Sequence, residues 1–150
     1  MQEIIPEDYM EFAAAFQSLS LRSVITATVV FYFFMALWYS PFMFGERWAR
    51  ESHLTGRLLR KRNTYAVYLV TLLMNFAAAL ILGMFITAQP TLQHGLIAGF
   101  GAGFFWVSMF ISIIYTFERR PLALYFIDCG YVTSAFTIMG GILGGWNSVF

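Results

Sequence analysis

Four long apolar runs, separated by short polar stretches, constrain this chain more than any other feature. They extend over Ser23 to Phe44, Tyr65 to Thr87, Gly95 to Phe117 and Leu122 to Gly145. A helix of about 20 mostly apolar residues crosses the hydrocarbon core of a bilayer. None of the runs contains Lys, Arg or Glu, and Asp128 is the one charged residue within them. The sequence therefore predicts an all-α membrane protein with four transmembrane helices.

The composition also favours lipid as the solvent. The chain is 59% hydrophobic and 11% charged, with a mean hydropathy of +0.68. Soluble domains carry about 25% charged residues, so a water-facing surface would be poorly covered here. The net charge of +1 argues against a nucleic-acid partner. The single cysteine, Cys129, cannot form an internal disulfide.

Basic residues lie almost entirely on one side of the predicted membrane. The second connection and the two ends hold only Arg22. The first and third connections hold Arg47, Arg50, Arg57, Arg60, Lys61, Arg62, Arg119 and Arg120. Basic loops stay in the cytoplasm and can contact anionic lipid headgroups. We therefore expect a multi-pass protein of the cell (inner) membrane with both termini outside, and with anionic headgroups at the basic cytoplasmic loop.

We expect residues 1–21 to form a separate element and residues 22–150 to form the transmembrane domain. Pro6 suits the first position of a helix, and the acidic residues that follow suit its first turn. One face of this helix would carry Tyr9, Phe12, Phe16 and Leu19. We expect an amphipathic helix on the outer membrane surface, with docking to a partner as the alternative.

The first and third apolar runs both lead into a Glu-Arg pair. These pairs are Glu46-Arg47 and Glu118-Arg119, and they lie at the same distance from the start of each run. The pattern is compatible with two helical hairpins in a parallel tandem repeat.

Small residues predict where the helices touch, because helices in lipid associate through close approach of their backbones. The spaced series are Ala79 and Gly83 in the second run, Gly95, Gly99 and Gly103 in the third, and Gly130, Gly141 and Gly144 in the fourth. The first run has no such series and is rich in bulky residues. We expect the second, third and fourth helices to pack tightly and the first to be more exposed to lipid.

The stretch WYSPFMFGERW closes the first run and leads into the basic loop. Trp38 and Trp48 fit the aromatic belt at the membrane interface. Pro41 is expected to end or kink the helix, and Gly45 permits a sharp turn after it.

Asp128 is expected near the same depth, about 10 Å inside the membrane from the start of the fourth helix. A buried carboxylate in lipid needs a partner or water. Within reach of this candidate polar site are Tyr39, Arg47, Glu118, Arg119, Arg120 and Tyr131. Asp128 is either a structural acid, held by an arginine with Tyr39 or Tyr131 donating a hydrogen bond, or part of a polar site open to the cytoplasm. Asn75, in the middle of the second run, is a further polar group that needs a partner.

Two blocks, WYSPFMFGERW and FERRPLALYFIDCGY, resemble the signature blocks of a family of small four-span membrane proteins, domain of unknown function 1761. The resemblance covers about residues 23–146, and at Cys129 the chain departs from the small aliphatic residue that members often show. The matching positions are Trp38, Tyr39, Pro41, Phe44, Gly45, Trp48, Glu118, Arg119, Arg120, Asp128, Gly130 and Tyr131. The resemblance implies the four-span fold and no activity.

No enzyme signature accompanies these features. His53 and His94 are expected on opposite sides of the membrane, so they cannot share a metal or a haem. We expect no enzymatic activity, no metal and no cofactor. The favoured function is an accessory or structural subunit of a membrane assembly, present as a homo-oligomer or within a larger complex. The alternative is a small oligomeric transporter or channel that uses Asp128, and a membrane enzyme acting on a lipid or quinone ranks last.

Overall fold

The computed structural model describes residues 7–53, 64–87 and 90–149, and these ranges contain helices and no strand. The elements are α1 (Glu7–Ser18), α2 (Leu21–Trp38), α3 (Gly45–Glu51), α5 (Thr64–Ile86), α6 (Leu92–Gly101), η1 (Ala102–Ser108), α7 (Met109–Phe117) and α8 (Leu122–Val149). Within these ranges four segments are long and apolar enough to cross a membrane: α2, α5, the continuous α6–η1–α7 segment and α8. The prediction of four such helices after an N-terminal helix is confirmed.

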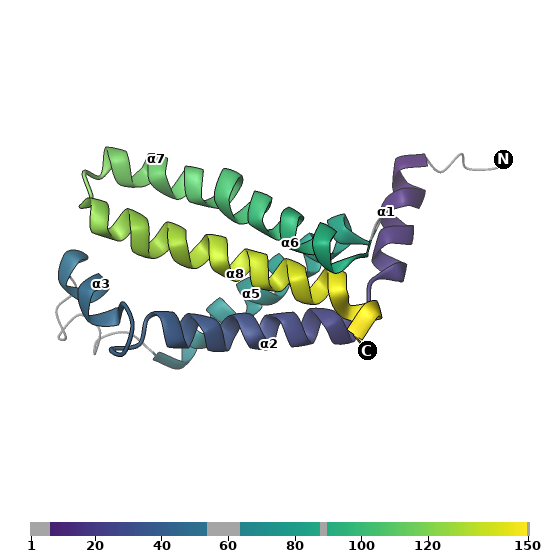
Figure 1. Ribbon diagram of the computed structural model, residues 1–150, viewed down its shortest axis with the longest axis horizontal. Coiled ribbons are helices and arrows are strands. Elements are labelled where there is room, and N and C mark those ends of the chain that lie inside the picture. Colours follow the sequence, from purple (N-terminus) through teal and green to yellow (C-terminus); the bar gives the residue numbers. More distant parts are fainter. Residues whose placement is uncertain (1–6, 54–63, 88–89, 150) are drawn as a thin grey trace.

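The spanning segments form an elongated bundle (Figure 1). One end carries α3 and the connection from α7 to α8, and we call it the basic end. The opposite end carries α1 and the end of α8, and α1 lies across the long axis of the bundle there (Figure 1). Phe16 of α1 is exposed, whereas Leu19 packs against the core. The side chains of Tyr9 and Phe12, and Arg57, Arg60, Lys61 and Arg62 of the first connection, lie outside the described residues.

The core lies between α2, α8 and the second half of α5. Val24, Ala27 and Phe31 of α2 are buried in one cluster with Ala135 and Met139 of α8. The expectation that the first helix is more exposed to lipid than the other three is therefore wrong. Its bulky residues join an aromatic cluster with α8, as in the edge-to-face contact of Phe31 with Tyr131 at 5.7 Å between ring centroids.

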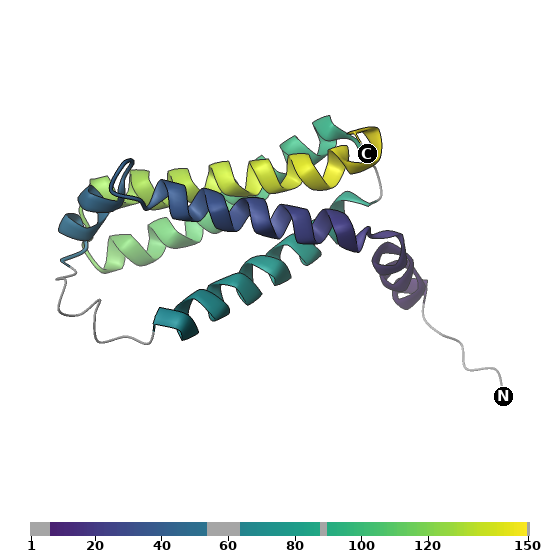
Figure 2. The same ribbon diagram turned by 90° about the horizontal axis from the view of Figure 1, so that it is seen from below.

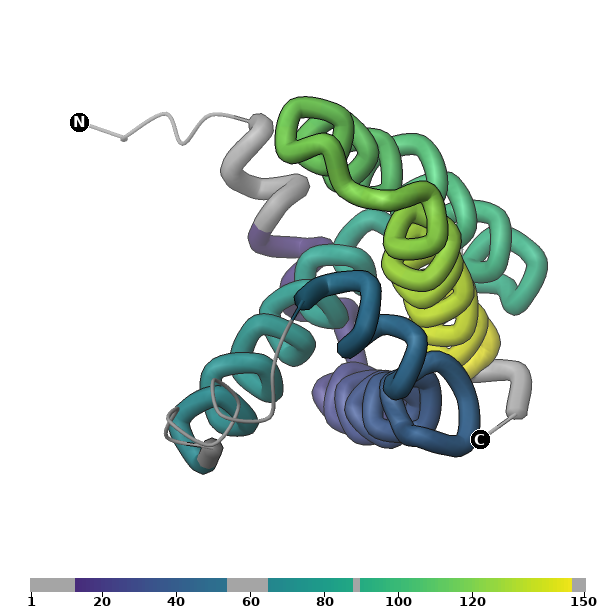
Figure 3. Tube along the Cα trace, turned by 90° about the vertical axis from the view of Figure 1, so that its left-hand side faces the viewer, coloured from purple at the N-terminus to yellow at the C-terminus, as the bar shows by residue number. Residues whose placement is uncertain are grey.

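Helix α5 is the peripheral spanning helix. It diverges from the bundle toward its Thr64 end (Figures 2 and 3), and Tyr65 and Met74 in that half are exposed. The buried residues of α5 all lie in its second half, Ala79 and Gly83 among them. A Cβ added at Gly83 would come within 2.6 Å of a Leu19 methyl group. The expectation that the second helix packs tightly therefore holds for its second half and not for its first.

The contact between α6 and α8 is made by the main chains. A Cβ at Gly95 would overlap the carbonyl oxygen of Gly140, and one at Gly99 would overlap that of Phe136. Gly103 continues this seam into η1, where an added Cβ would lie 2.9 Å from a Cα of α8. No side chain fits between these two helices without separating them.

The stripe of α8 that faces α6 differs from the predicted one. Gly144 touches the main chain at the start of α6, and Gly140 takes the position assigned to its neighbour Gly141. Gly141 instead lies against a leucine side chain of α6. Gly130 faces α2, since a Cβ there would lie 3.4 Å from the Trp38 ring.

The third spanning helix contains a π-helical segment, η1, that the sequence did not predict. The buried Ser108 hydroxyl lies 2.8 Å from the Gly103 carbonyl oxygen, five residues earlier. The same hydroxyl lies 3.2 Å from the Cys129 carbonyl oxygen and 3.1 Å from the Thr133 hydroxyl of α8. The widened turn thus brings a polar side chain against α8 at the point where the glycine seam ends.

Candidate functional site

The turn after α2 brings α3 back over the basic end. Helix α2 ends at Trp38, three residues before Pro41, where the helix was expected to end or kink, although the apolar run continues to Phe44. The Gly45 amide donates to the Ser40 carbonyl oxygen at 2.9 Å. A Cβ on Gly45 would overlap the Tyr39 carbonyl oxygen, so the close approach requires glycine.

This turn places two aromatic side chains against Asp128 of α8. The Tyr39 hydroxyl donates to Oδ1 of Asp128 at 2.6 Å, and the Trp48 indole Nε1 lies 3.3 Å from Oδ2. The Tyr115 hydroxyl, at the end of α7, donates to Oδ2 at 2.6 Å. Asp128 is only 6% exposed. We call these four residues the Asp128 cage.

The cage joins four separate segments of the chain. Its donors come from the turn after α2, from α3 and from α7, and its acceptor comes from α8. An indole N–H can only donate, and an ionised carboxylate can only accept, so the donors and the acid are chemically complementary. Hydrogen bonds to a charged acceptor are about twice as strong as neutral ones. The cage therefore offsets the cost of a carboxylate at this depth and ties the basic end together.

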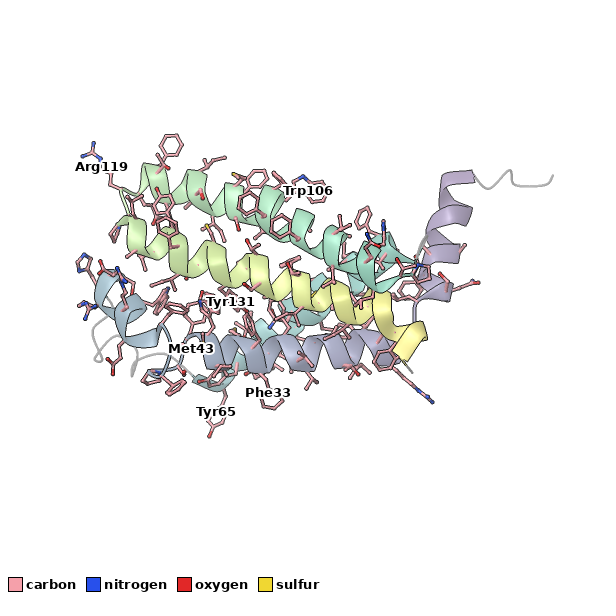
Figure 4. The ribbon with its side chains drawn as sticks, viewed as in Figure 1. Phe33, Met43, Tyr65, Trp106, Arg119 and Tyr131 are labelled. Atoms are coloured by element: carbon pink, nitrogen blue, oxygen red, sulfur yellow. The ribbon has the colours of Figure 1, made fainter. Side chains whose placement is uncertain are left out.

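An aromatic layer packs below the cage. Tyr131 lies between α8 and α2 (Figure 4), with its ring centroid 5.1 Å from that of Tyr39. The Trp38 indole donates to the Ile127 carbonyl oxygen at 3.1 Å. Tyr39, not Tyr131, is the tyrosine of this pair that bonds Asp128. Trp38 and Trp48 thus act as hydrogen-bond donors as well as interfacial rings.

The arginine partner expected for Asp128 is not found among the described residues. Arg120 Nε instead pairs with Oε2 of Glu118 at 2.7 Å, and this hydrogen bond raises the pKa of the Arg120 guanidinium. Arg119 points away from the bundle (Figure 4), and within the described ranges Arg47 forms no ion pair. The expectation of an Asp128–arginine pair is wrong, because aromatic donors at the same depth fill both carboxylate oxygens.

Asn75 lies apart from the cage, in the middle of α5. Its Nδ2 is buried and has no hydrogen-bond partner within the described ranges. An unsatisfied amide in an apolar environment costs about 1–3 kcal/mol by protein mutational data. This donor is a polar group that the bundle leaves unsatisfied.

A small cavity of about 180 Å³ lies beside the cage at the basic end. Trp48 and Tyr115, two donors to Asp128, form part of its wall, together with Ser52, Arg120 and Leu124. A wider hollow of about 400 Å³ also has Arg120 in its lining, along with Glu51, His53 and Glu118. The smaller cavity thus contacts two donors to Asp128, whereas the carboxylate itself is in the lining of neither hollow.

A larger hollow lies between α5 and the α6–η1 segment. It encloses about 600 Å³ and is apolar. Its small lining residues are Ala77, Ala78, Ala98, Gly101 and Ala102, and larger ones include Ile81, Phe85 and Trp106. We call this hollow the α5 cleft. None of its lining residues is titratable.

The described ranges contain no group of three or more His, Cys, Asp or Glu side chains able to hold a metal ion. His53 follows α3 at the basic end, and His94 lies near the start of α6 at the opposite end.

Tyr115 was missed as a site residue, although the sequence contains a signal for it. The connection from α7 to α8 is short, so residues at similar distances on either side of it lie at similar depth. Tyr115 lies three residues before this connection (118–121), and Asp128 lies seven residues after it. The tyrosine side chain is long enough to make up this difference in depth, since its hydroxyl reaches Oδ2 of Asp128. An intramembrane acid near the turn of a helical hairpin therefore favours a long polar side chain on the other helix as its partner.

Comparison with known proteins gives a family match. A family model described as "Protein of unknown function (DUF1761)" matches residues 22–144. This range includes the whole Asp128 cage, whereas α1 precedes it. No curated protein and no solved structure matches the chain.

Proposed function

Since the chain belongs to the DUF1761 family of proteins of unknown function, we propose its role from its own geometry: an accessory or structural subunit of a membrane assembly. The proposal includes no catalytic step, no metal and no cofactor. It is carried by one observation: both oxygens of the intramembrane carboxylate are occupied by donors from the same chain.

A carboxylate that serves a transport pathway must exchange its partners during each cycle. Asp128 instead makes short bonds to two tyrosines and a longer one to an indole, at the junction of several segments. Release of these bonds would leave an uncompensated charge in the membrane, at a cost of several kcal/mol. This arrangement favours a permanent structural role, in which the Asp128 cage holds the turn after α2, α3 and the α7–α8 hairpin together. We call this role the clasp.

The test is Asp128→Asn, which keeps the shape and removes the charge. One Asn atom becomes an NH₂ group facing donors, so we expect the free energy of unfolding in lipid to fall by about 2–3 kcal/mol. At equal abundance we expect no further defect in assembly with partner subunits, measured by native mass spectrometry of the extracted complex. Unchanged stability would contradict the clasp.

The second candidate function is a small oligomeric transporter. The cavity of about 180 Å³ favours it, because Trp48 and Tyr115, two donors to Asp128, form part of the cavity wall. A solute in this cavity would contact those donors. In this case Asp128→Asn would abolish ion or solute flux into vesicles while leaving the unfolding free energy unchanged. The same variant thus separates the two functions.

We further propose that the basic end faces the cytoplasm of a cell (inner) membrane, with both termini outside. The bias of Lys and Arg toward the first and third connections supports this orientation. A reporter fused after Phe150 should be active only outside the cytoplasm, and activity inside would contradict the orientation.

A further inference from the structure

The α5 cleft exposes backbone that the chain itself does not cover. A Cβ added at Gly101 would meet no atom within 4 Å, unlike at Gly95 or Gly99 on the same helix. Nothing inside the described chain therefore requires glycine at this position. Close approach of a helix from another molecule would require it.

Trp106 lies at the edge of the same cleft and has no partner. It is near the middle of the 26-residue span Leu92–Phe117, and its side chain is 66% exposed and projects outward (Figure 4). Among the described residues its indole N–H makes no hydrogen bond and its ring makes no aromatic contact. Tryptophan is favoured at membrane interfaces, where its N–H reaches polar groups, and not at mid-depth. The exposed indole thus needs an acceptor at the centre of the bilayer.

We propose that two copies of this chain form a parallel two-fold dimer in which Trp106 of each copy enters the α5 cleft of the other. The inference extends the structural role proposed above and rests on it. A two-fold axis along the membrane normal keeps each residue at the same depth in both copies. Side chains on a helix lean toward its N-terminus, so the Trp106 ring covers the depth of Ala102 and Gly101.

The cleft then supplies what Trp106 lacks. Main-chain carbonyl oxygens have two lone pairs, and a helix uses one of them. The exposed backbone at Gly101 lets an indole N–H from a second copy reach such a carbonyl. The same surface thus offers a protruding donor and a hollow with an acceptor, which is the self-complementarity that an isologous contact needs. A lipid acyl chain could fill the hollow but has no acceptor at this depth.

Cross-linking in vesicles of purified full-length protein tests the geometry. In a Cys129→Ser background, Ala98→Cys places a thiol in the α5 cleft. Phe33→Cys is the matched control, because Phe33 is 70% exposed on α2 and points away from this side of the bundle (Figure 4). We expect a bifunctional maleimide to yield covalent dimers from Ala98→Cys and none above background from Phe33→Cys. Equal yields, or dimers only from the control, would overturn the proposal.

Association measured by energy transfer during dilution with lipid tests the contact itself. Trp106→Phe keeps a ring but removes the N–H, and we expect about sevenfold weaker dimerisation, since the two-fold dimer loses two hydrogen bonds and membrane hydrogen bonds average about 0.6 kcal/mol each. Gly101→Leu should abolish the dimer, whereas Phe33→Ala should leave it unchanged. A protein that is monomeric at every dilution, or a dimer insensitive to Gly101→Leu, would overturn the proposal.

Native mass spectrometry of the same samples separates the other occupants. A monomer that retains a lipid, and loses it in Gly101→Leu, would assign the cleft to lipid and overturn the proposal. A complex of one copy with a different membrane protein would do the same. Neither result would touch the proposed clasp, because Asp128→Asn tests that role through the unfolding free energy of a single copy.

Discussion

The two sides of the α6–η1 segment use small residues in opposite ways. Gly95 and Gly99 face α8 and let the two main chains touch, whereas Gly101 faces the α5 cleft and touches nothing. Both sides look alike in sequence, as small residues at helical spacing. The difference teaches that a small residue marks a surface where another helix can come close. Whether a helix of the same chain lies there depends on how the other helices are arranged.

The largest expected effect comes from placing the same substitution on each side. Gly99→Leu would drive a side chain into the Phe136 carbonyl, a main-chain group that cannot move aside. We expect a loss of at least about 3 kcal/mol in the free energy of unfolding, or failure to fold. Gly101→Leu should leave the stability of a single copy within about 0.5 kcal/mol. Thermal unfolding in nanodiscs that hold one copy measures both, and equal losses would erase the distinction between the two sides.

A second comparison concerns the two faces of α2. Phe31 is buried against Tyr131 and Phe136, whereas Phe33 is 70% exposed. We expect Phe31→Ala to lower the free energy of unfolding by about 2–3 kcal/mol. The loss is smaller than in a soluble core, because lipid is as apolar as the protein interior and mainly packing is lost. Phe33→Ala should cost almost nothing in the same unfolding assay. If both variants unfold like the parent, α2 is not part of the core.

The spanning helices could be predicted from the sequence because the thickness of a bilayer sets the length of an apolar run. The contacts between these helices could not be predicted in the same way. The bulky first run looked unfit for packing, but Phe31 and Trp38 interlock with α8 through ring edges that no spacing rule describes. Adjacent glycines posed a similar problem, since only the rotation of α8 decides that Gly140 meets the main chain of α6 and Gly141 a leucine side chain.

The candidate site was predicted in its location but not in its bonding. Asp128 and Tyr39 were expected near each other, and they bond at 2.6 Å. The expected arginine partner is wrong because neutral N–H and O–H donors can satisfy a carboxylate as well as a positive charge can. Trp48 and Tyr115 satisfy the acid as neutral donors, which need not be desolvated as ions. Charge patterns therefore indicate orientation in the membrane better than they indicate bonding partners.

A third prediction sharpens the contrast between the clasp and the exposed part of α5. Tyr115→Phe removes one of the two short hydrogen bonds to Asp128. We expect the unfolding free energy to fall by about 1–2 kcal/mol, since the lost bond has a carboxylate acceptor. Tyr65→Phe is the control, because Tyr65 is 88% exposed at the free end of α5. Denaturant titration in mixed micelles should show a lower midpoint for Tyr115→Phe alone, and a shift in both would point to a general effect of hydroxyl loss.

The smallest expected effect is also the one that separates folding from association most cleanly. Gly101→Ala adds a single methyl group where nothing lies within 4 Å. Alanine is favoured over glycine inside a helix by about 0.5–1 kcal/mol, so a single copy should become slightly more stable. The same methyl group covers the backbone that we propose receives Trp106 from a second copy, so dimerisation should weaken. A rise in stability without a change in dimerisation would mean that the backbone at Gly101 does not contact a second copy of the chain. A fall in single-copy stability would mean that Gly101 is packed within the chain, and that the two sides of the helix are alike after all.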